Sequence, residues 1–316
     1  MKSYRDYLFL FLKGIGMGSA DVVPGVSGGT IAFITGIYEE LLGTINSFDQ
    51  QAFKYLKQFD LKKLWSHVNG SFLLPILAGI GVSVLTLAKL ISHLLETSPI
   101  QIWSFFFGLI IISSISVAKE IKNWNVGVIC SGLAGILVAY FITIITPAST
   151  PDSYWFIFLC GAIAICAMIL PGISGSFILL LLGKYTFIIL ALKDLNLAVI
   201  AVFGLGCVTG LLSFSRLISW TLAKFHNYAI AMLAGFMVGS LNKVWPWKIA
   251  KLFHIDHHGE QVPISEQNIL PTMYYEQTGQ DPNIIQSLLF MALGFVIVVI
   301  LEKIALMISY AQKKSI

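Results

Sequence analysis

Long apolar runs alternate with short polar segments along this chain. A helix needs about 20 apolar residues to cross the hydrocarbon core of a bilayer. Two apolar regions, roughly residues 7–45 and 155–192, are long enough for two helices each, but a Pro-Gly pair interrupts both. Six further runs are predicted to be full crossings: Phe72–Leu95, Ile100–Val117, Val126–Ile145, Leu197–Ala223, Tyr228–Val244 and Ile284–Leu306. The pattern predicts an all-α polytopic membrane protein whose interrupted regions either span twice or enter and return as re-entrant hairpins.

The two interruptions carry copies of one phrase, Pro24-Gly25-Val26-Ser27-Gly28-Gly29 and Pro171-Gly172-Ile173-Ser174-Gly175-Ser176. Moving the chain by 147 positions, which places Pro24 on Pro171, also pairs Gly36 with Gly183. A second shift, of 127 positions, pairs Lys89 with Arg216. The chain is therefore interpreted as an internal duplication, with a first repeat at 1–147 and a second at 148–316.

The distribution of lysines predicts the orientation. The loop at 46–71 is basic, Lys119 and Lys122 follow a later run, and the chain ends in Lys313-Lys314. The positive-inside rule places these segments and both termini in the cytoplasm. Each repeat then has one hairpin (7–45 or 155–192) and three crossings, and the second has an outer loop at 246–283. An odd number of crossings inverts the second repeat, as in many secondary transporters.

Composition agrees with a membrane protein. Hydrophobic residues make up 57% of the chain, charged residues only 11%, and the mean hydropathy is +0.83. A soluble domain typically has about 25% charged residues.

The stretch from His254 to His258 has metal-binding side chains, but no helix or strand is predicted to fix them. We expect no metal, no other cofactor and no nucleic-acid partner; the expected partners are lipids.

The broken segments are the predicted binding site. Proline removes a backbone donor and glycine permits a sharp turn, so each serine can open a new helix. The free N–H groups and positive dipole at a helix start attract anions. A single copy is more simply a kinked helix, but the duplication favours a paired site. The candidate substrate-binding residues are Pro24, Gly25, Ser27, Gly28, Gly29, Thr30, Pro171, Gly172, Ser174, Gly175 and Ser176.

Three ionisable residues within the apolar runs are further candidates, because charge at membrane depth is costly and often functional. Asp21, whose counterpart is Met168, either couples transport to protons or caps the broken helix, and both readings stay open. Arg216 and Lys89 occupy equivalent positions and are predicted to receive an anion on opposite sides. Lys89 is more simply a residue that reaches the interface, whereas the planar guanidinium of Arg216 suits phosphate.

The chain resembles a known bacterial family in three segments. These are Lys13 to Thr30, Leu170 to Ser176, and Gly239-Ser240-Leu241 with Trp245-Pro246-Trp247. The family is known as domain of unknown function 368, and its members are linked to polyprenyl-phosphate transport of the PopT type. The resemblance covers nearly the whole chain. It implies return of undecaprenyl phosphate from the outer to the inner leaflet of the bacterial cytoplasmic membrane.

Two other functions are weighed against that one. Undecaprenyl-pyrophosphate phosphatases also resemble inverted repeats with a Pro-Gly-x-Ser loop, but their loop carries an arginine. Here Gly28 and Gly175 follow the serines, so the group that would stabilise phosphoryl transfer is missing and no catalytic residue is expected. A transporter of a small soluble anion remains the alternative, because the same helix starts would serve it.

Overall fold

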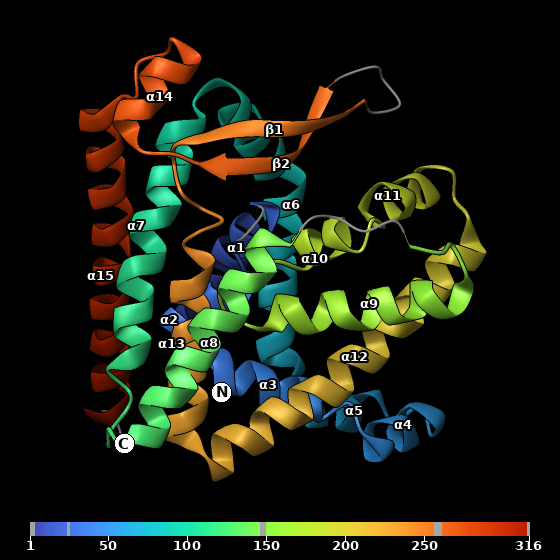
Figure 1. Ribbon diagram of the computed structural model, residues 1–316. Helices are drawn as coiled ribbons and strands as arrows, with labels where there is room; N and C mark the ends of the chain where they lie inside the picture. The colour runs from blue at the N-terminus through green and yellow to red at the C-terminus, as the bar shows by residue number, and fades with distance from the viewer. Residues whose placement is uncertain (1–3, 24–25, 146–149, 256–260, 315–316) are drawn as a thin grey trace.

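The computed structural model describes residues 4–23, 26–145, 150–255 and 261–314 (Figure 1). The first half of the chain forms α1 (Tyr4–Val22), α2 (Gly28–Ile34), α3 (Tyr38–Asn46), α4 (Gln50–Lys57), α5 (Leu61–His67), α6 (Gly70–Thr97), α7 (Pro99–Ala118) and α8 (Val126–Ile144). The second half forms α9 (Tyr154–Ile169), α10 (Gly175–Leu181), α11 (Tyr185–Lys193), α12 (Leu197–Lys224), α13 (His226–Ser240), β1 (Lys248–Ile255), β2 (Gln261–Asn268), α14 (Pro271–Thr278) and α15 (Ile284–Lys314).

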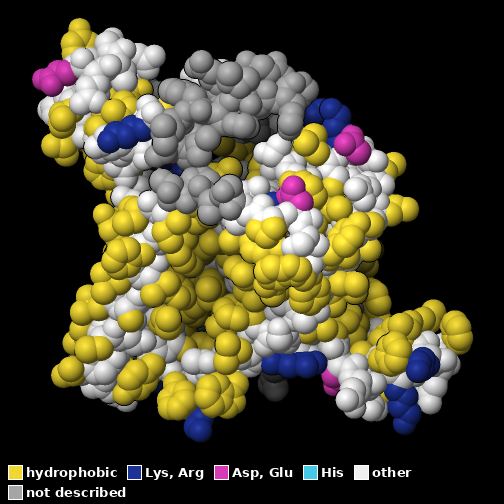
Figure 2. Space-filling model, turned by 45° about the vertical axis from the view of Figure 1, so that its right-hand side comes forward, with side chains coloured by type: hydrophobic (Ala, Val, Ile, Leu, Met, Phe, Trp, Pro, Cys, Tyr) yellow, Lys and Arg dark blue, Asp and Glu magenta, His cyan; other side chains and the backbone are white. Residues whose placement is uncertain are grey.

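Five helices of the described chain are long and apolar enough to cross a membrane: α6, α7, α8, α12 and α15. The number rises to six if α10 and α11, bent by 109° at their junction, count as one broken span. Figure 2 shows hydrophobic side chains covering the middle of one face, with lysines, arginines and acidic residues near its upper and lower margins. The prediction of a multi-pass membrane protein is confirmed.

The expected crossing at Tyr228–Val244 is shorter than predicted. Helix α13 has 15 residues and ends at Ser240. Asn242 and Lys243 follow, and Pro246 cannot continue a helix with normal hydrogen bonding. The polar pair therefore lies beyond the helix instead of inside its last turn.

Three helices of the first half have helices of equal length at corresponding places in the second half. Helices α2 and α10 each have 7 residues, α3 and α11 each have 9, and α6 and α12 each have 28. Gly36 and Gly183 precede α3 and α11 with φ of 70° and 63°, a left-handed conformation that glycine adopts without strain. The duplication of the chain stays a prediction from the sequence.

Close helix pairs join the halves. A Cβ added to Gly108 of α7 would lie 2.1 Å from the Met291 carbonyl of α15, and one added to Gly235 of α13 would lie 2.2 Å from the Gly132 carbonyl of α8. Small residues allow such close backbone approach between membrane helices. Figure 1 shows α7 beside α15 and α8 beside α13. The second expected crossing of each half (α7 or α13) thus packs on the last expected crossing of the other half (α15 or α8).

The all-α prediction is wrong at one place, because β1 and β2 form an antiparallel hairpin. Apolar residues alternate in part with lysine and histidine along β1, as strands favour. Trp245 and Trp247 anchor this region by donating their indole N–H groups to the Ile269 and Pro282 carbonyls. His254 is the second-last residue of β1, whereas Asp256, His257 and His258 lie outside the described residues. Within the described chain, no group of three His, Cys, Asp or Glu residues could hold a metal.

Candidate functional site

The two motif loops meet. The Ser27 hydroxyl donates to the Met168 carbonyl at 2.8 Å, and the Gly172 N–H donates to the Thr30 hydroxyl at 3.1 Å. A Cβ on Gly29 would lie only 2.4 Å from the Ile169 carbonyl oxygen. Segments more than 140 positions apart therefore form one buried junction, which requires a glycine at position 29.

The start of α2 is closed by the protein's own oxygen atoms. Ser27 is the N-cap, and its hydroxyl accepts from the Gly29 N–H at 3.0 Å. The Asp21 carboxylate accepts from the Gly28 N–H at 2.7 Å. The predicted anion-binding N–H groups of Gly28 and Gly29 are therefore bonded to protein atoms in this conformation. Pro24 and Gly25 lie outside the described residues.

The start of α10 is built differently. Ser174 is its N-cap but makes no capping bond to the backbone; its hydroxyl is 2.8 Å from the Ser176 hydroxyl. Gly172 has φ of 90°, which permits the turn before it. A small cavity lies beside this loop, lined by residues that include Gly172, Ser174, Thr143, Phe177, Ser240 and Lys243. The second motif therefore borders an open space, whereas the described part of the first is packed shut.

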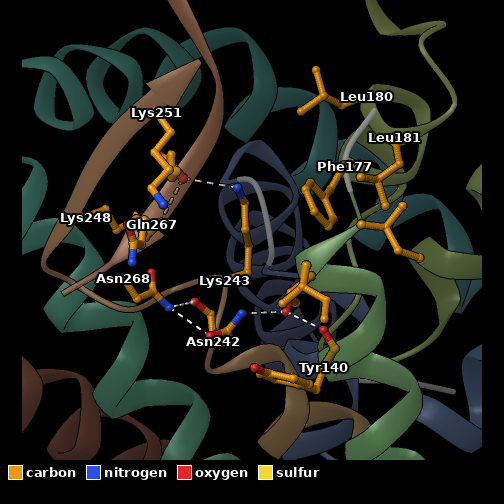
Figure 3. Close-up of a pocket in the computed structure, with 14 residues that line it drawn as sticks. Tyr140, Phe177, Leu180, Leu181, Asn242, Lys243, Lys248, Lys251, Gln267 and Asn268 are labelled. Carbon is orange, nitrogen blue, oxygen red and sulfur yellow. Dashed lines mark hydrogen bonds and ion pairs between the residues drawn. The ribbon is translucent and has the colours of Figure 1, made fainter. Parts of the chain in front are cut away.

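A larger cavity of about 370 Å³ adjoins the small one and shares Thr143, Phe177 and Lys243 with it. We call it the lysine cavity, because Lys243, Lys248 and Lys251 line it together with Glu266, Asn242 and Asn268. Figure 3 shows Lys248 and Lys251 on the side of the β-hairpin, and Phe177, Leu180 and Leu181 across from them. One wall is therefore polar and cationic, and the opposite wall is apolar.

One carboxylate faces two of the ammonium groups. Glu266 accepts from Lys243 at 3.2 Å and lies 3.5 Å from the Lys248 ammonium. Burial alone would raise the pKa of the Glu266 carboxyl, but Lys248 and Lys243 hold it below its usual value. Burial lowers the pKa of Lys248 to about 8, although Glu266 opposes this effect. Lys248 therefore stays mainly protonated at neutral pH.

Hydrogen bonds fix the floor of the cavity. The Asn268 amide donates to the Asn242 carbonyl at 2.7 Å, and the Asn242 amide donates to the Thr143 hydroxyl at 2.7 Å (Figure 3). This chain of bonds joins β2, the segment after α13, and α8. The hairpin is thereby held over the second motif.

The structure does not bring all predicted residues together. Asp21, Ser27, Thr30 and Gly172 share the junction, whereas Arg216 and Lys89 lie on exposed faces of α12 and α6. Among the described residues, no hydrogen bond or ion pair of the structure joins either cation to a motif loop. Lys243 is the cation beside the second motif.

Sequence reasoning missed Lys243, Lys248, Lys251 and Glu266. Lys243 fell within an expected crossing, and the others fell in a loop to which no structure was assigned. Two signals were present: the polar pair Asn242-Lys243 interrupts an apolar run, and β1 alternates in part between apolar and polar residues.

Comparison with known proteins identifies relatives over nearly the full chain. The model of a family described as undecaprenyl phosphate translocase-like matches residues 17–262. A polyprenyl-phosphate transporter from Vibrio cholerae is 45% identical over 300 residues, which cover 95% of this chain and 97% of that protein. A polyprenyl-phosphate transporter from Staphylococcus aureus is 32% identical over 254 residues, covering 74% and 85%. No solved structure matches this chain.

Proposed function

We propose a function from one established premise: the chain belongs to the undecaprenyl phosphate translocase-like family. The function of this chain is transport of a polyprenyl phosphate, in agreement with the names of its two relatives. The finer proposal is that undecaprenyl phosphate moves from the outer to the inner leaflet of a bacterial cytoplasmic membrane. The observation that supports it most is the buried hydrogen bond from Gly172 of the second motif to Thr30, which directly follows the first motif.

The proposed architecture is a pair of inverted repeats, each with a re-entrant hairpin. Ser104 and Ser287 are hydrogen-bonded, and Gly108 approaches Met291 further along both helices, so α7 and α15 run in parallel. Gly132 approaches Ala231 and Gly239 approaches Ile136, so α8 and α13 are also parallel. Consecutive crossings α7 and α8 run in opposite directions through a membrane. Because α13 is parallel to α8, α13 runs in the opposite direction to α7, its counterpart in the other repeat. This arrangement supports inversion, and alternating access follows if the halves rock about the motif junction.

The proposed path takes the phosphate through the protein while the apolar tail stays in lipid. A charged headgroup in hydrocarbon is costly without polar partners. The lysine cavity gives it polar partners, and both the small cavity beside Ser174 and the Ser27 junction must open for it to pass further. Arg216 and Lys89 are exposed at equivalent positions in the C-terminal thirds of α12 and α6, and they remain the proposed cations for release and capture.

Asp21 has two proposed roles, proton coupling and capping of α2. The bond from the Gly28 N–H to its carboxylate supports capping. The two roles predict different behaviour when the carboxylate becomes an amide. An amide oxygen still accepts the hydrogen bond, but it does not carry a proton through the transport cycle.

We expect the transporter to prefer a lipid phosphate to a soluble one. Transport of labelled undecaprenyl phosphate into proteoliposomes would be measured with increasing inorganic phosphate, and with sulfate as the matched control for ionic strength. The apolar wall of Phe177, Leu180 and Leu181 gives the lipid contacts that inorganic phosphate lacks, so a large excess of phosphate should leave transport nearly unchanged. Full competition at equal concentration would instead indicate a small-anion transporter.

A further inference from the structure

We propose that the lysine cavity binds the phosphate of the lipid substrate, and that Glu266 is an internal anion which the phosphate displaces. This inference rests on the proposed function, because it assigns a headgroup site to the same substrate. It adds a site that no motif of the sequence indicated. The ligand is a phosphate monoester with an apolar tail.

The charge of the cavity favours an anion. Among the described residues that line it, there are three lysines and one carboxylate, Glu266. The carboxylate pairs with Lys243 and Lys248, while Lys251 makes no ion pair with a described residue. A phosphate monoester carries between one and two negative charges near neutral pH. The cavity therefore has the excess positive charge that such a headgroup needs.

A buried cation in the cavity lacks a hydrogen bond. The Lys248 side chain is 7% exposed, and its ammonium has no partner at hydrogen-bond distance and angle among the residues that the structure describes; Glu266, at 3.5 Å, is its ion-pair partner. The ammonium also lies 3.6 Å from the centre of the Trp103 ring. Burying an ammonium group without full hydrogen bonding is unfavourable. A phosphate oxygen in the cavity would supply the missing acceptor.

The shape of the cavity suits an amphiphile. Its volume of about 370 Å³ holds a phosphate and the first part of a prenyl chain, but not a long polyprenyl tail. Leu180, Leu181 and Phe177 form the wall opposite the lysines (Figure 3). A headgroup on the lysine side would direct its tail along this wall toward lipid. A site for a soluble anion would not need the apolar wall.

The position of Lys243 joins this site to the second motif. Lys243 and Thr143 line both the lysine cavity and the small cavity beside Ser174. The ammonium of Lys243 also lies 4.8 Å from the centre of the Phe177 ring, near the start of α10. Lys243 therefore connects a phosphate bound in the lysine cavity to the start of α10, although the small cavity of about 10 Å³ would have to widen before the phosphate could enter it.

Direct binding tests the inference separately from transport. The full chain in lipid nanodiscs would be titrated with radiolabelled farnesyl phosphate, with inorganic phosphate as a competitor. Lys243→Gln and Lys251→Gln should each raise the Kd about tenfold, since each removes a charged donor. Glu266→Gln should lower the Kd several-fold, because it removes the competing anion while keeping the shape of the side chain. Lys119→Gln, at an exposed residue beyond α7, is the matched control and should bind as wild type.

The opposite signs distinguish a binding site from a structural brace. If the lysines and Glu266 only hold the hairpin in place, all three substitutions would weaken binding together, and that result would overturn the inference. Lys243→Arg, which keeps the charge, should restore binding and guards against a folding defect. If both lysine variants bind with unchanged affinity while the wild type transports the lipid, the proposed headgroup site is wrong and the proposed function stands. A wild type that neither binds nor transports the lipid would overturn the proposed function itself.

Discussion

Gly29→Ala should strongly impair transport. The added methyl group would lie 2.4 Å from the Ile169 carbonyl oxygen, which belongs to the backbone and cannot rotate away. Overpacking in a tight interior typically costs about 1–3 kcal/mol and forces the backbone to move. Here the movement separates the motif loops and breaks the bonds from Ser27 to Met168 and from Gly172 to Thr30. We expect the translocation rate in proteoliposomes to fall by more than tenfold.

Gly43→Ala is the matched control for this substitution. Gly43 lies within α3, and apart from the backbone of that helix and the two chain neighbours, no described atom lies within 4 Å of an added Cβ. Alanine favours a helix over glycine by about 1 kcal/mol, so this variant should be at least as stable as wild type. Both proteins would be compared by thermal unfolding and by transport per folded molecule. Wild-type transport by Gly29→Ala would contradict the tight junction between the loops.

Asp21→Ala should lose transport, whereas Asp21→Asn should retain most of it. Alanine removes the acceptor of the buried Gly28 N–H, and an unsatisfied buried donor costs about 1–3 kcal/mol. Asparagine keeps an oxygen that accepts the same bond. The measurement is the transport rate of each variant, with and without an imposed pH gradient across the proteoliposome membrane.

The asparagine variant decides between the two roles of Asp21. If the carboxylate only caps α2, a pH gradient should change wild type and Asp21→Asn to the same extent. An inactive Asp21→Asn whose thermal unfolding matches wild type would refute the capping account and assign proton coupling to this residue. Neither alanine nor asparagine adds bulk to the site, so steric clashes do not affect the comparison.

Local signals explain what the sequence predicted well. Proline and glycine act on the chain where they stand, so the predicted breaks are found between Val22 and Gly28 and between Ile169 and Gly175. The second bend of each motif region, at Gly36 and Gly183, was not predicted, although these glycines had been paired. A lone glycine within an apolar run does not reveal whether its φ is positive.

Contacts between distant segments explain what the sequence did not predict. The bond from Ser27 to Met168 and the bond from Gly172 to Thr30 depend on how the halves dock, which no local pattern encodes. The lysine cavity likewise forms only when β1 and β2 fold over α8 and α10. The hairpin escaped detection because β1 alternates only in part between apolar and polar residues, and β2 is mainly polar.

Translocation of labelled undecaprenyl phosphate in proteoliposomes tests the central claim most directly. The lipid would be placed in one leaflet, its appearance in the other would be followed over time, and free phosphate would be assayed in the same samples. Protein-free vesicles and the Gly29→Ala variant provide the controls. The account predicts that the intact lipid crosses with wild type and that no phosphate is released. Release of phosphate, or no crossing by a folded wild-type protein, would contradict it.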